Sequence, residues 1–184
     1  MSAGKTEPNL RRIVTSQASQ GSYVLAEGGP TAGFAGLCDI WRASLAADAA
    51  FSPHDLGPRA VRLEPPLGGV VARWFTVDPQ DEGMSNGEMR ALAARTFERI
   101  GATNCHRDGP DPAMHQTASL DFVCLLSGSA SLVLDAAETF LSPGDVVVQQ
   151  GTAHAWRAYG GPALFFAVLI DRRSPCKPSS GVNS

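Results

Sequence analysis

The chain has 184 residues, of which 43% are hydrophobic and 18% are charged, and its formal net charge is −3 at pH 7. This length suits one domain, and the small acidic excess provides no cationic surface for a nucleic-acid backbone. The longest apolar run, 163–170, is much shorter than the roughly 20 residues of a membrane-spanning helix, and the first residues contain no signal-peptide core. We therefore expect a cytoplasmic protein that binds neither nucleic acid nor membranes.

Both ends of the chain are polar or rich in Ser, Pro and Gly. We expect residues 1–10 and 174–184 to be flexible, which leaves a single domain over 11–173. The four cysteines include no Cys-x-x-Cys pair, a pattern typical of free thiols in a reducing compartment.

Short β-type runs separated by turn residues recur along the chain. They fall at 11–14, 22–27, 38–43, 60–64, 70–77, 121–126, 130–135, 138–142, 145–150, 155–159 and 163–171. After Asp121 the turns come at the roughly 8–12-residue spacing of antiparallel folds. This pattern predicts an all-β sandwich or barrel.

One segment departs from the β pattern. Residues 85–101 place Met89, Leu92, Ala93, Phe97 and Ile100 near helical spacing. The residues at 85 and 88 are the Ser and Glu of a capping box, and the glycine at 101 can end a helix. The apolar stripe predicts a helix that covers one side of the barrel.

The β runs near the N-terminus exceed what one small barrel needs. A surplus strand can pair with the sheet edge of another copy of the chain. We therefore expect an N-terminal β extension and a homodimer.

Two of the four histidines, His115 and His154, flank the regular β region. Along a strand His115, Thr117 and Asp121 would share one face. Six residues of straight strand cover about 20 Å, so the chain must bend between Thr117 and Asp121 if they are to share a site. His115, Asp121 and His154 would then offer two imidazoles and a carboxylate, a donor set suited to iron, manganese or zinc with open positions for catalysis.

Two segments carry a family resemblance. HQTASLD at 115–121 followed by Gly128 resembles the first sequence motif of the cupin superfamily, with Thr117 in place of that motif's second histidine. PGDVVVQQGTAHAW at 143–156 resembles the second motif, matched at Gly144, Gly151 and His154. The chain is most similar to small single-domain cupins (the cupin type-2 conserved barrel) with His-x-Thr…Asp and Gly-x-x-His-Ala-Trp motifs.

This resemblance implies a double-stranded β-helix, the jelly-roll barrel of cupins, with its core motifs within 113–171. Because of the surplus N-terminal β runs and the helical segment at 85–101, we expect this barrel to carry an N-terminal β extension and one covering helix.

For function, the resemblance implies a range of small-molecule reactions. We expect an oxidoreductase of secondary-metabolite biosynthesis, acting on an aromatic or polyketide substrate, with His115, Asp121 and His154 as catalytic residues and ligands of a divalent Fe, Mn or Zn ion. The first alternative is a non-redox dehydratase, cyclase or decarboxylase, in which His115 and His154 exchange protons and Thr117 hydrogen-bonds the substrate. The second is a cupin that binds a metabolite without turnover.

Three further residues are candidates for contact with a small hydrophobic or aromatic substrate. Trp156 lies two residues beyond His154, hence on the same strand face, where an indole can stack on an aromatic ring. Thr117 supplies a hydroxyl, and Met114 an adaptable thioether next to His115.

Overall fold

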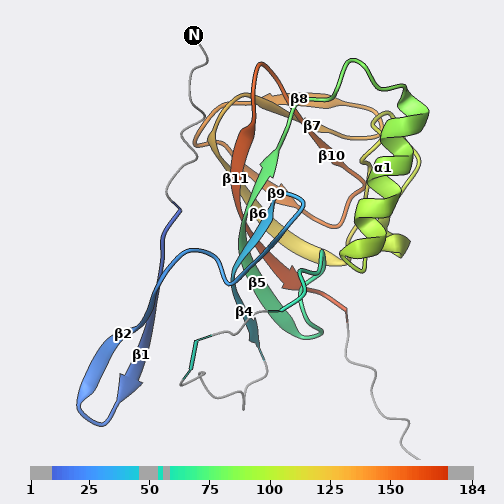
Figure 1. Ribbon diagram of the computed structural model, residues 1–184. Coiled ribbons are helices and arrows are strands. Elements are labelled where there is room, and N and C mark those ends of the chain that lie inside the picture. The colour runs from blue at the N-terminus through green and yellow to red at the C-terminus, as the bar shows by residue number, and fades with distance from the viewer. Residues whose placement is uncertain (1–9, 46–53, 56–58, 174–184) are drawn as a thin grey trace, which may run out of the picture.

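The structure is a computed structural model, and it describes residues 10–45, 54–55 and 59–173. These residues form eleven strands, one α-helix and a short 3-10 helix, η1 (Thr103–Cys105). Figure 1 shows the later strands wrapped into a barrel, with α1 (Asn86–Arg99) along one side. The fold is an all-β jelly roll, which confirms the fold predicted from the sequence.

The larger wall of the barrel is a six-stranded antiparallel sheet. In spatial order its strands are β3 (Ala32–Phe34), β4 (Leu37–Ser44), β5 (Gly69–Val77), β11 (Ala163–Asp171), β6 (Ser119–Ser127) and β9 (Val146–Gln149). The central strand β11 pairs with β5 on one side and β6 on the other, so elements far apart in sequence lie together.

The smaller wall is a three-stranded antiparallel sheet in the order β10 (Ala155–Ala158), β7 (Ala130–Val133) and β8 (Glu138–Leu141). Ala130 and Ala158 from this sheet share one buried cluster with Val71, Phe165 and Leu169 from the larger sheet. The two sheets therefore enclose a common hydrophobic core between them.

Alternation along β5 and β11 determines which side chains enter that core. Val71 and Phe75 of β5 and Phe165 of β11 are buried, whereas Ala72 and Trp74, on the other face of β5, are more exposed. The rings of Phe75 and Phe165 stack with centroids 4.6 Å apart. Arg73 occupies an inward position of the same alternation and is also buried.

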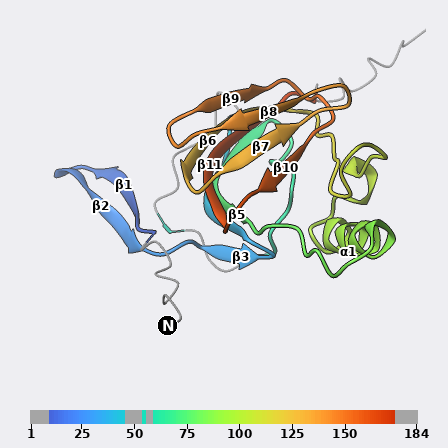
Figure 2. The ribbon, with the colours of Figure 1, turned by 90° about the horizontal axis from the view of Figure 1, so that it is seen from above.

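The N-terminal extension is a separate hairpin of β1 (Arg12–Ala18) and β2 (Gly21–Gly28). Figures 1 and 2 show it projecting away from the barrel, on the opposite side from α1. Ile13 and Val24 on this hairpin are more than half exposed, at 55% and 54%. The extension thus leaves apolar side chains on the surface.

The predicted helix is present as α1, and its capping box is formed. The Ser85 hydroxyl accepts from the backbone N–H of Glu88, whose carboxylate accepts from the backbone N–H of Ser85. Phe97 and Ile100 are buried toward the barrel, but Leu92 is 48% exposed, so the apolar stripe covers less than predicted. No helix among the described residues is long and apolar enough to cross a membrane.

The structure corrects two details of the strand pattern. Residues 60–64 are not a strand, and a strand not predicted, β3, occupies 32–34. The alternation at 60–64 has another cause, because Val61 and Leu63 pack against Phe97 and Ile100 at the end of α1. Of the predicted flexible ends, all but Leu10 lie outside the described residues, and one domain over 11–173 stays a prediction.

Glycine at 128, in the turn between β6 and β7, allows a close approach of two chain segments. Gly128 has φ +89°, and a Cβ there would lie 2.6 Å from the carbonyl oxygen of Pro162. Gly160 has a similar φ of +69° but no atom within 4 Å of such a Cβ. The left-handed backbone costs a non-glycine residue about 1–2 kcal/mol at either site, and only Gly128 adds a steric overlap.

We therefore expect Gly128→Ala to lower the free energy of unfolding by about 3 kcal/mol and Gly160→Ala by about 1 kcal/mol. Urea unfolding followed by circular dichroism measures both. Equal losses in the two variants would contradict the role given to the contact with Pro162.

Candidate functional site

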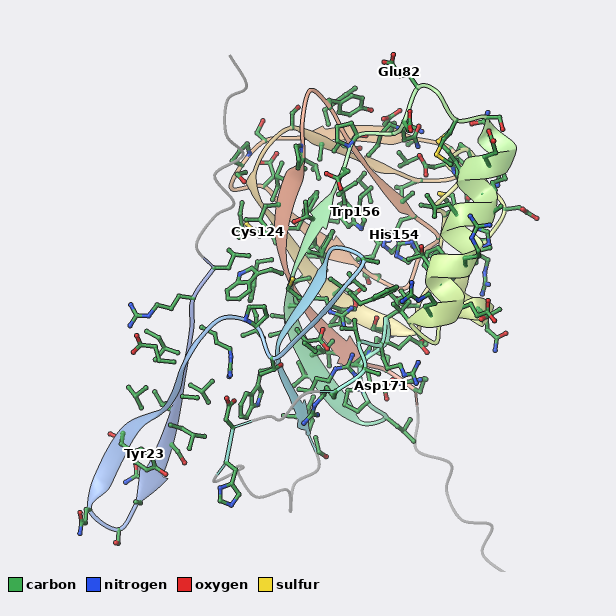
Figure 3. All side chains as sticks on the ribbon, in the orientation of Figure 1. Tyr23, Glu82, Cys124, His154, Trp156 and Asp171 are labelled. Carbon is green, nitrogen blue, oxygen red and sulfur yellow. The ribbon has the colours of Figure 1, made fainter. Side chains whose placement is uncertain are left out.

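A cavity of about 230 Å³ opens inside the barrel, between the two sheets and α1. Its walls are mostly apolar, and Phe75 and Phe97 contribute to them. Five of the residues predicted for the site line it: His115, Thr117, Asp121, His154 and Trp156. In Figure 3 the labelled His154 and Trp156 lie between the barrel strands and α1.

Backbone pairing brings the two histidines together. The N–H of His115 donates to the carbonyl of His154 at 2.8 Å, and the N–H of His154 donates to the carbonyl of His115 at 2.9 Å. Residues that exchange both bonds lie directly opposite one another in an antiparallel ladder. The imidazoles are therefore neighbours, with centroids 4.2 Å apart.

Both imidazoles are fixed by a second backbone contact. Nδ1 of His115 lies 3.0 Å from the carbonyl oxygen of Ala113, and Nδ1 of His154 lies 2.9 Å from that of Thr152. A carbonyl only accepts, so each Nδ1 must carry the proton in this contact. In the neutral ring Nε2 then keeps its lone pair, which can accept a proton or bind a metal.

Aromatic rings pack on both sides of the His115–His154 pair. Phe97 of α1 lies 5.3 Å from the His115 ring, and Trp156 of β10 lies 5.6 Å from the His154 ring, edge to face. Trp156 in turn packs 5.1 Å from Phe165. The histidine pair is thus enclosed by apolar rings, and sequence reasoning assigned Phe97 only to the covering helix.

Thr117 and Asp121 belong to the same cavity, but from the start of β6. Residue 117 precedes the strand, and Asp121 lies inside it, opposite Gln149 of β9. The Ser119 hydroxyl donates to Oγ1 of Thr117 at 2.9 Å. Oδ1 of Asp121 is buried and has no hydrogen-bond partner among the described residues.

The other predicted contact residue, Met114, does not belong to the cavity lining. It is fully buried among Val133 and Ala155 instead. Its neighbour His115 faces the cavity, and adjacent residues in extended chain point to opposite sides.

A charged residue that the sequence reasoning did not single out also lines the cavity. Arg73 of β5 is only 2% exposed, and its Nη2 lies 3.0 Å from Oδ1 of Asp39. The run VVARWF carries the signal, because Arg73 shares strand parity with the apolar Val71 and Phe75. A cation on the apolar face of a buried strand indicates a specific partner.

Curated proteins similar to this chain include two that are named for a cupin domain. The chain is 37% identical over 70 residues to the cupin-domain-containing oxidoreductase virC of Hypocrea virens, covering 35% of this chain and 34% of that protein. It is 35% identical over 68 residues to the cupin-domain-containing oxidoreductase fogC of Aspergillus ruber, covering 34% of each. These matches support a cupin barrel for this chain over about a third of its length.

Another relative of this chain is the phomopsin biosynthesis cluster protein D of Diaporthe leptostromiformis, 48% identical over 52 residues, or 28% of each chain. No protein-family model matches. Among solved structures, the cupin 2 domain-containing protein of Halorhodospira halophila is 20% identical with a TM-score of 0.36, over 60% of this chain and 59% of that chain. The matches to these curated relatives span only 28–34% of the relatives' own length.

The apolar surroundings keep both His115 and His154 neutral. Burial, together with the neighbouring His115, lowers the pKa of His154 to about 3. Burial is also the main cause that lowers the pKa of His115, and His106 adds to it. At neutral pH the cavity therefore presents two uncharged imidazoles.

Asp121 is shifted in the opposite direction. Burial raises the pKa of its carboxyl from 3.8 to about 6, although Ser119 and the Arg73 guanidinium favour the ionised form. Asp121 therefore exchanges its proton closer to neutral pH than an exposed aspartate does.

The donor set is suited in part to the predicted metal ion. Neutral imidazoles whose Nδ1 is bound to a backbone carbonyl are oriented as metal-bound histidines are. Within the described ranges, however, no group of three or more His, Cys, Asp or Glu side chains is placed to hold a metal ion. His115 and His154 thus form a pair of donors that Asp121 does not complete, and an Fe, Mn or Zn centre stays a prediction.

The raised pKa of Asp121 links stability to pH. Between its ordinary value of 3.8 and about 6, the folded protein holds a proton that the unfolded chain has released, so this contribution to stability falls as pH rises. The difference corresponds to about 3 kcal/mol. We expect the free energy of unfolding of the wild type, relative to Asp121→Asn, to fall by about this amount between about pH 4 and 6.5.

Urea unfolding at a series of pH values measures this difference. Protonation of the two histidines in the unfolded chain lowers stability in acid, but it does so in both proteins and largely cancels. The control variant is Asp135→Asn, which removes an exposed carboxylate in the turn after β7 and retains Asp121, so it should show the same fall relative to Asp121→Asn. A flat difference between the wild type and Asp121→Asn would contradict the burial effect.

Proposed function

We propose that this cupin is a small-molecule enzyme of secondary metabolism that transfers protons on an apolar, oxygen-bearing substrate. The observation that carries the proposal is the His115–His154 pair, two neutral imidazoles with fixed tautomers on the wall of an apolar cavity. Positioned bases in a water-poor site are what general acid–base catalysis requires.

Nε2 of either histidine is the proposed proton acceptor. A proton on one imidazole is disfavoured by the apolar walls and by the second ring, as the lowered pKa of His154 indicates. The transfer therefore occurs only when negative charge develops on the substrate beside the imidazolium. This requirement favours substrates whose anion is delocalised, such as an enolate.

In such a step, a C–H bond next to a carbonyl breaks and its proton moves to Nε2. The bonding electron pair forms the C=C bond of the enolate, and the carbonyl π pair moves onto oxygen. No electrons leave the substrate, so the step needs no oxidant. Elimination of water, ring closure or loss of carbon dioxide can each pass through this type of intermediate, in line with a dehydratase, cyclase or decarboxylase.

Asp121 and Thr117 have supporting roles in the proposal. A carboxyl group with a pKa of about 6 can return a proton near neutral pH. Because Ser119 donates to Oγ1 of Thr117, the hydroxyl hydrogen of Thr117 remains to be donated to a substrate oxygen. Phe97 and Trp156 contact the histidine rings and exclude water from them.

A second candidate function is an oxidoreductase. It is favoured by the names of two relatives, both cupin-domain-containing oxidoreductases, over about a third of this chain. A divalent ion held by His115 and His154, with Asp121 as the predicted third ligand, would supply the redox chemistry. In an oxidoreductase the same cavity would bind and orient the apolar substrate. A cupin that binds a metabolite without turnover would hold that metabolite in the same cavity.

Deuterium exchange into 2-tetralone, a bicyclic apolar ketone, tests the proposal. We expect the wild type in D₂O to accelerate exchange of the protons next to the carbonyl, as followed by NMR. Conversion of His154 or His115 to Gln should reduce that acceleration by about 100-fold. The matched control is His106→Gln, because His106 stacks on Phe97 but does not line the cavity.

If the wild type accelerates no exchange, or if His154→Gln exchanges as fast as His106→Gln, the proton-transfer proposal is wrong. Binding of 2-tetralone without exchange would support a binding cupin. One equivalent of Fe, Mn or Zn in the wild type, lost in both histidine variants, would make the oxidoreductase the better function.

For the partner, we propose a homodimer formed through the hairpin β1–β2. The supporting observation is the exposure of Ile13 and Val24 on an element that projects from the barrel (Figure 1). Light scattering should give twice the chain mass of 19.3 kDa for the wild type, and the single-chain mass for the double variant Ile13→Asp with Val24→Asp. A wild-type mass of one chain would contradict the dimer.

A further inference from the structure

The cavity contains an unusual cation. Arg73 is 2% exposed, yet its Nε and Nη1 have no hydrogen-bond partner among the described residues. Only Nη2 is engaged, by Asp39 at 3.0 Å and by the carbonyl oxygen of Arg62 at 2.6 Å. Three of the five N–H groups of the guanidinium are therefore buried and unpaired, on a side chain that lines the cavity.

The position of Arg73 follows from strand pairing. On β5 it lies opposite Asp39 of β4 on one side and Ala167 of β11 on the other. Asp39 provides a counter-charge, and the small side chain of Ala167 adds little bulk beside the long arginine. Ala167 also lines the cavity.

Charge in this part of the barrel is not balanced by Asp39 alone. Asp39 also pairs with Arg42 at 2.8 Å, so two guanidinium groups share this carboxylate. The Asp121 carboxylate adds a second negative charge that acts on Arg73, but it does not pair with the Nε or Nη1 of Arg73. Burial lowers the pKa of Arg73 to about 10, which still leaves it positively charged at neutral pH. Leaving buried donors of a charged group unmatched is costly, whereas an anionic oxygen would satisfy them.

We infer that Arg73 binds an anionic oxygen of the substrate, a carboxylate or enolate, while the apolar body of that substrate occupies the rest of the cavity. The inference rests on the proposed function for the cavity, and it narrows the substrate class to apolar ring compounds that bear an acidic oxygen. Arg73 then stabilises negative charge on the substrate and positions its ring against Trp156 and the histidine pair.

A purely structural role for Arg73, as the partner of Asp39, predicts different behaviour. Arg42 holds the same carboxylate and also donates to the carbonyl of Arg62, but it does not line the cavity. Arg42→Met therefore disturbs the same ion-pair cluster without removing the proposed ligand contact. It is the matched control for Arg73→Met.

The probes are 1-naphthoate and its uncharged counterpart 1-naphthamide, with binding measured by calorimetry at pH 7.5. We expect the wild type to prefer naphthoate by at least about 10-fold, because charge-assisted contacts to arginine are the stronger ones. Arg73→Met should remove this preference while binding of naphthamide changes by less than about 3-fold, and Arg42→Met should retain it.

Equal binding of the two probes by the wild type would overturn the inference, and so would an unchanged preference in Arg73→Met. If Arg73→Met does not fold, ¹⁵N NMR of the wild type can instead test whether Arg73 contacts the anionic probe. The Nε–H resonance of Arg73, assigned through Arg73→Lys, should shift with naphthoate and not with naphthamide. No shift with naphthoate would overturn the inference.

These outcomes are independent of turnover. If His154→Gln retains the preference for naphthoate while the exchange of 2-tetralone is absent even in the wild type, the proposed function fails and the Arg73 site stands. If the wild type accelerates the exchange of 2-tetralone but binds naphthoate and naphthamide equally, the proposed function stands and the Arg73 site fails.

Discussion

The site depends on one short piece of backbone pairing, the two hydrogen bonds that His115 and His154 exchange. Their residues are 39 positions apart in the chain, and local geometry alone would not bring them together. The pairing places two imidazoles next to each other inside the barrel, with their planes tilted by 50°, and the carbonyls of Ala113 and Thr152 then fix their tautomers. The chemistry available to the cavity follows from this arrangement.

The apolar walls determine how the polar groups behave. Burial makes a charged imidazole, carboxylate or guanidinium less favourable, which moves the pKa values of His154 and Asp121 in opposite directions. Arg73 stays charged because its pKa remains near 10, and Asp39 offsets part of its burial. The barrel thus keeps an apolar cavity that nevertheless holds a base, an acid and a cation, at a cost in stability that functional sites commonly carry.

Much of the fold could be predicted because alternation and turn residues are local signals. The capping box at Ser85 and Glu88, the later strands and the turn at Gly128 all follow from residues a few positions apart. The pattern failed at 60–64, where alternation reflects packing on α1 and no strand is there to pair with it. Periodicity reports which side is buried, and it does not report what covers that side.

The sequence by itself determined an all-β class and the helix, because alternation and capping are local patterns. Its resemblance to cupins implied the jelly roll, and this resemblance together with strand parity pointed to one set of site residues: His115, Thr117, Asp121, His154 and Trp156. Only the tertiary structure decided that Met114 turns away, that Phe97 closes against the histidines and that Arg73 reaches the cavity. These outcomes depend on which strands and helices become neighbours, and a contact between elements far apart in sequence leaves no local pattern.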